Sequence, residues 1–302
     1  MGDENRSESN PKNQHGVWRG ACINQKCFLP KNSMNKYVHG YSPEETNRLN
    51  DQANSVAGIL HSDSVWQEGS LILEAGCGVG AQTKTIAPKN SQSHFVSIDI
   101  SSESIGQAKK LTDSLGIENV EFRQANIFDL PFEDEYFDHV FVCFVLEHLP
   151  NPITALSELK RVLKPNGTMM LIEGDHGSTY FHPDSSEAKK AIQCQVLLQQ
   201  QNGGDANIGR KLYPILNDAG FKEIKVSPRQ VYVDDSIPEL VEGFTKNTFT
   251  AMIKGIAEEA ISKQIISRDE MQKGINDLLK TAEGGGTFCY TFFKATARKS
   301  KN

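Results

Sequence analysis

The sequence predicts an α/β fold, a doubly wound and mostly parallel sheet with helices on both faces. Two observations predict this class. Segments typical of buried strands alternate with segments of helical periodicity, which is the order of a parallel sheet with crossover helices. The first strand-like segment also ends in a glycine-rich turn, the device with which such sheets hold nucleotides at the carboxyl ends of their strands.

The glycine turn lies within residues 71–83, which read LILEAGCGVGAQT. An apolar run typical of a buried strand leads through Glu74 into three glycines, Gly76, Gly78 and Gly80. Glycine lets the chain turn tightly, so that backbone N–H groups and the next helix N-terminus face a ligand. The spacing also fits the dinucleotide-binding pattern with alanine in the last position, so the turn alone does not choose the cofactor.

A second strand-like run, residues 94–100, reads HFVSIDI and contains Asp99 near its end. This carboxylate follows the glycines by about twenty residues, the separation at which such folds place an acid on the ribose hydroxyls. The turn and the acid therefore indicate two contacts to the same nucleoside.

Further elements follow in the same alternation. Residues 120–123, 139–144 and 168–172 are expected to be strands, with helices that begin at the cap Ser101 and at Asn151-Pro152. A helix over 212–219, a strand over 221–226 and a last strand over 287–297 complete the predicted core.

In combination, these segments resemble the class I S-adenosylmethionine (SAM) dependent methyltransferases, in particular their small-molecule, type 11-like branch. The resemblance covers about residues 70–175 and includes Asp129-Leu-Pro-Phe and Lys164-Pro-Asn-Gly as well as the glycine turn. It implies a seven-stranded sheet whose last strand is antiparallel, SAM as the cofactor, and methyl transfer to N, O or S of a small metabolite.

The resemblance also implies which residues hold SAM. The acid and the glycines of the turn would lie under the methionine part, Asp99 on the ribose and Ile100 beside the adenine. Asn126 stands where the family usually has Asp, and its amide can still accept from an amino group and donate to a ring nitrogen. The full set of expected cofactor contacts is Glu74, Gly76, Gly78, Gly80, Asp99, Ile100, Asn126, Ile127 and Cys143.

Three residues are candidates for catalysis. His176 is the first choice for a general base, because imidazole titrates near neutral pH and the flanking Gly174 and Gly177 allow a turn that exposes it. The alternative is that His176 caps the strand end and bonds to backbone. Asp175 would orient this histidine or contact a cationic acceptor. His148 follows the fourth strand together with Glu147, where helix capping is the alternative role.

Three further residues are candidates for acceptor binding. Tyr37 and Tyr41 precede the first helix, where family members fold a segment over SAM, so they are expected to wall the methyl site or to pack at an edge. Arg210 is expected to take an acidic group of the substrate or to solvate its own helix face.

Net charge and composition limit the kinds of partner that the protein is expected to bind. The formal net charge is −6 and the cations are scattered without a basic stripe, which argues against nucleic acid as substrate. No run of eighteen apolar residues and no targeting pattern is found, so we expect a cytoplasmic protein without membrane contact. A homodimer is a further expectation. The six cysteines are spread out, which indicates free thiols and no metal site.

The expected domain organisation has three parts. Residues 1–33 form a flexible tail, and residues 34–233 with 287–299 form the SAM-binding domain. Residues 177–209 form a first insertion with a helix over 188–201. Residues 234–286 form a helical insertion with capping boxes at Ser236–Glu239 and Ser267–Glu270, and we expect it to cap the acceptor side of the SAM site. Edge cover or a dimer surface is the alternative.

Two other functions remain open. An NAD(P)-dependent reductase would use the same glycine turn, although the Asp129-Leu-Pro-Phe and Lys164-Pro-Asn-Gly segments do not support it. A SAM-binding regulator without catalysis would keep the cofactor residues and lack an acceptor site.

Overall fold

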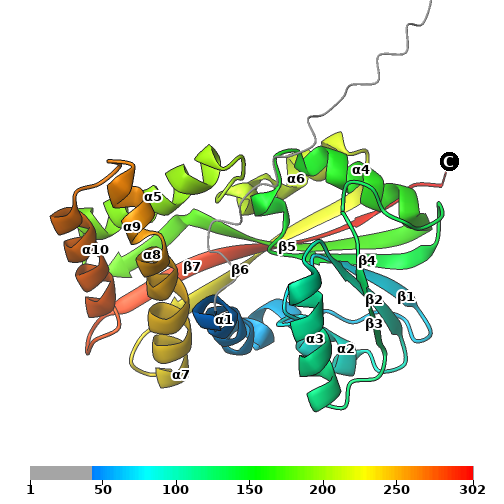
Figure 1. Cartoon of the computed structure of the whole chain (residues 1–302), viewed down its shortest axis with the longest axis horizontal. Helices are drawn as coiled ribbons and strands as arrows, with labels where there is room; N and C mark the ends of the chain where they lie inside the picture. Colours follow the sequence, from blue (N-terminus) through cyan, green and yellow to red (C-terminus); the bar gives the residue numbers. More distant parts are fainter. Residues whose placement is uncertain (1–42, 302) are drawn as a thin grey trace, which may run out of the picture. The chain divides into compact units, whose positions relative to one another are not determined.

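The structure of the protein is a computed structural model that describes residues 43–301. Its strands form one seven-stranded sheet in the order β3-β2-β1-β4-β5-β7-β6 (Figure 1). Only β7 runs antiparallel to its neighbours, which confirms the predicted fold class. The strands are β1 (Leu71–Ala75), β2 (His94–Asp99), β3 (Val120–Gln124), β4 (Phe137–Cys143), β5 (Leu163–His182), β6 (Lys222–Val233) and β7 (Thr287–Arg298).

Helices connect these strands in the predicted alternation. Those of the core are α1 (Pro43–His61), α2 (Thr83–Lys89), α3 (Ser102–Ser114), η1 (Leu146–His148), α4 (Pro152–Val162), α5 (Ser186–Gln201), η2 (Ile208–Lys211) and α6 (Leu212–Asp218). Those between β6 and β7 are α7 (Pro238–Leu240), η3 (Val241–Thr250, a π-helix), α8 (Ala251–Gly255), α9 (Ala257–Ser262) and α10 (Arg268–Lys280).

Local signals explain several boundaries. The hydroxyl of Ser101 accepts the N–H of Ser104 at 3.1 Å and starts α3 as predicted. Gly116 follows that helix with a φ of 67°, a conformation that glycine adopts at little cost. Pro152 occupies the first turn of α4, where its missing N–H has no intrahelical partner to lose.

Both faces of the sheet are covered. Apolar side chains of α1 and α2, of the helices between β6 and β7, and of the last strand form one core. Side chains of α4 and α6 form a second core on the other face. No helix within residues 43–301 is both long enough and apolar enough to span a membrane.

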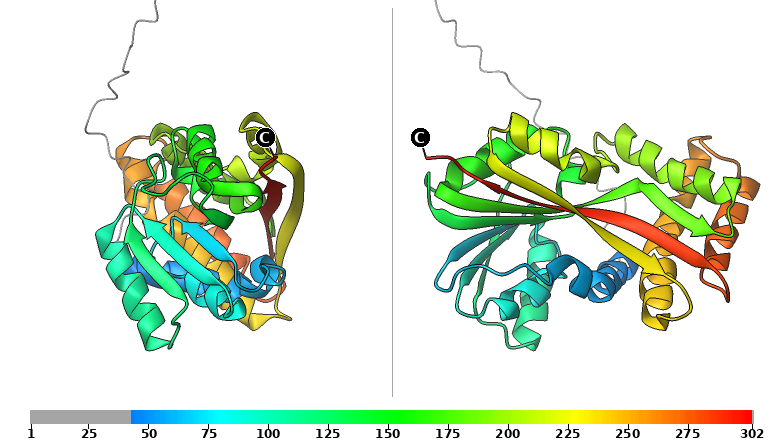
Figure 2. Two further views of the ribbon diagram at one scale, coloured as in Figure 1. Left: turned by 90° about the vertical axis from the view of Figure 1, so that its right-hand side faces the viewer. Right: turned by 180° about the vertical axis from the view of Figure 1, so that it is seen from behind.

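The fifth and sixth strands are much longer than predicted. β5 was expected to end at Ile172, yet it continues to His182 and pairs with β7 as far as Thr287. β6 likewise continues to Val233. Figure 2 shows these strands and β7 running beyond the rest of the sheet towards α5 and α10. Residues 177–182 are therefore strand rather than the start of an insertion, because β7 supplies a hydrogen-bonding partner that no local sequence signal reveals.

The segment between β6 and β7 is helical as predicted. The capping box of Ser267 and Glu270 is present at the start of α10. The expected box of Ser236 and Glu239 is absent, because Ser236 bonds to Asp234 and the residue before α7 is Ile237. The buried side chains of this segment belong to the same core as α1 and the sheet.

Candidate active site

Three glycines shape the turn after β1, with backbone φ values of 79° at Gly76, 52° at Gly78 and 80° at Gly80. A Cβ on Gly76 would overlap Val145, and one on Gly80 would come within 3.1 Å of Ala108 in α3. No atom lies within 4 Å of the Cβ position at Gly78. Packing explains the first and third glycines, whereas Gly78 borders open space, as a ligand-binding turn requires.

Asp99 lies at the end of β2 beside this turn. Its Oδ2 accepts a hydrogen bond from the N–H of Gly78 at 2.9 Å, and its Oδ1 accepts one from the N–H of Ser101 at 2.9 Å. The carboxylate is thereby fixed at the turn and keeps further lone pairs for ligand hydroxyls. The neighbouring Ile100 is 54% exposed, which is available surface for a flat apolar group.

Glu74 is buried beneath the glycine turn. Its Oε2 accepts hydrogen bonds from Thr83 Oγ1 at 2.8 Å and from Ser97 Oγ at 2.6 Å. The pKa of this carboxyl is raised to about 7, mainly by burial and also by the nearby Asp99, against the lowering effect of the two hydroxyls. Glu74 therefore ties the start of α2 and the middle of β2 to the end of β1.

The other expected cofactor residues differ in exposure. Asn126 is exposed, and its Oδ1 accepts the N–H of Phe128 at 3.0 Å in a local turn. Ile127 is half-buried and packs against the second core. Cys143 is buried at the end of β4, and burial raises the pKa of its thiol, which leaves a neutral apolar wall rather than a nucleophile.

The expected exposure of His176 is wrong. His176 lies inside β5 with only 6% of its surface exposed, and its Nδ1 is 2.6 Å from the hydroxyl of Tyr290 in β7. The pairing of β5 with β7 is irregular between Asp175 and Tyr180, so His176 and Gly177 lie in a bulged stretch of the strand that does not expose the histidine. A Cβ on Gly174 would stand 2.5 Å from that hydroxyl, so this glycine makes room for the pair. Burial lowers the pKa of His176, so the ring is neutral at pH 7.

Asp175 and Arg210 pair with each other in the structure. Asp175 points to the other face of β5, where its two oxygens accept hydrogen bonds from Arg210 at 2.8 and 2.7 Å. A strand places successive side chains on opposite faces, so Asp175 cannot orient the neighbouring His176. Arg210 is paired with this buried carboxylate while 47% of its side chain stays exposed, and its binding of an acidic substrate stays a prediction.

Polar side chains from η1, β5, α5 and β7 meet near the end of β4. This polar cluster consists of Glu147, His148, His176, Gln199 and Tyr290. Gln199 donates to the carbonyl of Glu147 at 2.9 Å and to its carboxyl group at 3.2 Å. Burial lowers the pKa of His148, so both histidines of the cluster are neutral bases at pH 7.

Aromatic side chains form the wall beside this cluster. The rings of Phe249 and His176 are 6.2 Å apart, and Phe249 lies 5.6 Å from Tyr290. Phe244 and Phe292 lie 5.8 and 4.7 Å from the same tyrosine. Two of these rings come from η3, so the segment between β6 and β7 contributes directly to the surroundings of His176.

Tyr290 and Gln199 were not predicted as site residues. Alternation along the last strand places Tyr290 on an inner face, but its partner His176 is 114 residues away in sequence. Gln199 opens a run of three glutamines that carries no motif. The expected substrate residues Tyr37 and Tyr41 lie outside the described residues.

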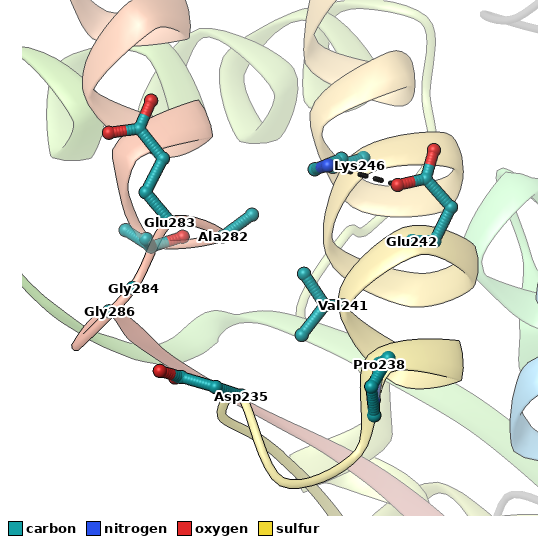
Figure 3. A pocket seen from close by; sticks show the side chains of 10 residues that line it. Asp235, Pro238, Val241, Glu242, Lys246, Ala282, Glu283, Gly284 and Gly286 are labelled. Atoms are coloured by element: carbon teal, nitrogen blue, oxygen red, sulfur yellow. Dashed lines mark hydrogen bonds and ion pairs between the residues drawn. The ribbon is translucent and has the colours of Figure 1, made fainter.

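One hollow of about 270 Å³ lies away from this site (Figure 3). It is formed where the chain leaves β6 and where it returns to β7, and it contains the ion pair of Lys246 and Glu242. None of the predicted site residues lines it. Within residues 43–301, no group of three or more His, Cys, Asp or Glu side chains is arranged to hold a metal ion.

Comparison with known proteins gives a family match. The family described as a methyltransferase domain matches residues 67–220. The uncharacterized 37.1 kDa protein in transposon TN4556 of Streptomyces fradiae is 33% identical over 221 residues, which cover 70% of this chain and 63% of that protein. The probable methyltransferase ltbC of Aspergillus luteorubrus is 32% identical over 164 residues, 51% of this chain and 56% of the relative. The chain thus spans about three fifths of these curated relatives.

A solved structure shares the fold. The phosphoethanolamine N-methyltransferase 2 of Haemonchus contortus, solved with phosphomonomethylethanolamine and S-adenosylhomocysteine, superposes with a TM-score of 0.53 at 17% identity. The match covers 86% of this chain and 59% of that one.

Proposed function

Because this chain belongs to the class I SAM-dependent methyltransferases, we propose that it transfers the methyl group of SAM to N, O or S of a small metabolite. The observation that carries the proposal is the glycine turn with Asp99 bonded to the N–H of Gly78. This arrangement supplies an open backbone surface and a fixed carboxylate at the carboxyl ends of the strands, where open α/β sheets bind ligands.

The cofactor residues have distinct proposed roles. Gly78 gives the methionine part of SAM close access to the backbone, and Asp99 accepts hydrogen bonds from the ribose hydroxyls. Ile100, Ile127 and Asn126 surround the adenine. Cys143 forms part of the apolar wall of the cofactor site, and the buried Glu74 supports the glycine turn. Neither is proposed to contact SAM through an exposed polar atom.

Methyl transfer requires few catalytic groups. The sulfonium loses its positive charge as the acceptor bonds to the methyl group, so alignment and exclusion of water provide most of the rate. A base is needed only for an acceptor that binds in its protonated form. His176, held by Tyr290 within β5, and His148, beside Glu147 after β4, are both neutral and belong to the two segments nearest the proposed methyl group.

The helical insertion, residues 234–286, is proposed to cap the acceptor side. Its Phe249 packs against His176 and its Phe244 against Tyr290. An acceptor that reaches the polar cluster would therefore meet side chains of the insertion. The net charge of −6 and the absence of a basic stripe favour a small acceptor over nucleic acid.

An untargeted metabolite screen with methyl-labelled SAM tests this function. We expect one compound or one chemical class to gain the labelled methyl group with the wild-type chain and not with Asp99→Ala. A chain that binds SAM and labels nothing would be a SAM-binding regulator. Tight binding of NADH without binding of SAM would instead favour a reductase.

A further inference from the structure

Glu173 of β5 is a buried carboxyl group that the mechanism above does not use. None of its surface is exposed. Its Oε1 accepts hydrogen bonds from the N–H of Val145 at 3.1 Å and from the N–H of Leu146 at 2.8 Å. These are the first N–H groups of the single turn η1, which have no partner within so short a helix.

The second oxygen of this carboxyl has no hydrogen-bond partner among the described residues. Burial raises the pKa of Glu173 well above its usual range, and the nearby Glu147 raises it further, against the lowering effect of the backbone N–H groups. The N–H groups of Val145 and Leu146 hold Oε1 whether the group is ionised or protonated, whereas Oε2 lies buried without a partner. Burial and the neighbouring Glu147 therefore favour the protonated form of Glu173.

The turn that Glu173 holds has two functional sides. Val145 packs so closely against Gly76 that any Cβ there would overlap it. The next residues of the turn, Glu147 and His148, belong to the polar cluster. Residues 145–148 thus border the glycine turn on one side and the proposed acceptor site on the other.

We infer that Glu173 is a positioning residue, which caps η1 through its Oε1 and so sets the place of Glu147 and His148 relative to the glycine turn. The importance of this role for catalysis rests on the proposed function. The ordering of residues 145–148 by the Glu173 side chain does not depend on which acceptor is methylated.

Two variants of similar length separate the cap from side-chain volume. Glu173→Gln keeps a neutral oxygen acceptor, whereas Glu173→Met fills the space and removes the acceptor. Asp138→Leu is the matched control, because Asp138 also accepts a backbone N–H, that of Leu71 at 2.9 Å, but at the amino end of β1. The readouts are amide exchange over residues 144–149, the NMR titration of labelled His148, and calorimetry with S-adenosylhomocysteine.

We expect Glu173→Met to speed exchange at the amides of 145–147 about tenfold or more and to shift the titration of His148. Glu173→Gln should restore both to within about twofold of wild type, which a merely space-filling role would not require. Asp138→Leu should leave both unchanged. Exchange in Glu173→Met no faster than in the control, or in Glu173→Gln as fast as in Glu173→Met, would overturn the inference.

If Glu173→Met does not fold, Glu173→Gln decides, since wild-type exchange supports a neutral cap and faster exchange rejects it. Calorimetry keeps the two proposals apart. A wild-type chain that does not bind S-adenosylhomocysteine would reject the proposed function, while the exchange data would still decide the role of Glu173.

Discussion

At the scale of single residues, Asp99 gives the most direct test of the cofactor site. Asp99→Ala should weaken binding of SAM or its demethylated product by about 1.5–3 kcal/mol, because charge-assisted hydrogen bonds to two hydroxyls are lost. Calorimetry measures this directly, with one site per chain expected. The control Asp99→Asn keeps an oxygen acceptor for Gly78 or Ser101, so it should bind more tightly than the alanine variant. Wild-type affinity in Asp99→Ala would remove Asp99 from the site.

Glu74 makes the stability of the cofactor-free protein depend on pH. Its pKa is raised from 4.5 to about 7 in the folded chain, so its neutral form favours folding below pH 4.5 and that contribution is lost as the pH rises to about 7. The loss amounts to about 3 kcal/mol. Glu74→Gln has no carboxyl group to ionise and so avoids this loss. The variant should therefore gain stability over wild type between pH 5 and pH 8 in urea titrations. The exposed Glu118→Gln controls for one lost charge and should show no such gain.

The pair of His176 and Tyr290 is expected to serve acceptors that must lose a proton. His176→Ala should then lower turnover about a hundredfold with nearly unchanged SAM affinity. Burial lowers the pKa of His176, so the base is already unprotonated at pH 7, and its loss of activity in acid should lie below pH 6.5. Tyr290→Phe removes the hydroxyl but keeps the ring. This variant should shift the acidic limb of the pH dependence of kcat. Unchanged turnover in both variants would exclude this base.

At the scale of elements, the contact of η3 with α1 depends on a glycine. A Cβ on Gly243 would overlap the hydroxyl of Ser55. Gly243→Ala is therefore expected to destabilise the fold by about 1–3 kcal/mol through overpacking. Adding Ser55→Ala removes the overlapping oxygen and should recover part of the loss in a double-mutant cycle of unfolding free energies. Additive effects of the two substitutions would show that the helices do not meet at this point.

At the scale of the whole molecule, the helical insertion is expected to unfold together with the sheet. Its Phe244, Phe249 and Ile253 belong to the same buried core as Trp66 and Phe141. Shared burial couples the free energies of the two parts, so one transition is expected. Urea titrations followed by tryptophan fluorescence and by far-ultraviolet circular dichroism should coincide. A separate, earlier loss of helix would indicate that residues 234–286 form an independent unit.

The sequence by itself determined the sheet, its alternation with helices and the glycine turn with Asp99. These features depend on local patterns: apolar runs of strand length, the caps Ser101 and Ser267, and glycines at positions with positive φ. Each acts over a few residues, so it can be recognised without knowledge of the fold. The helical character of residues 234–286 was predictable for the same reason.

Only the tertiary structure decided the surroundings of His176. Its burial depends on the extension of β5 along β7, and its partner Tyr290 is 114 residues distant. The same strand alternation turned Asp175 away from His176 and towards Arg210. Glu173 belongs to no motif, because its capping role follows from burial and from two backbone N–H groups of another element. Contacts between distant segments determine burial, and burial determines which of these side chains are charged.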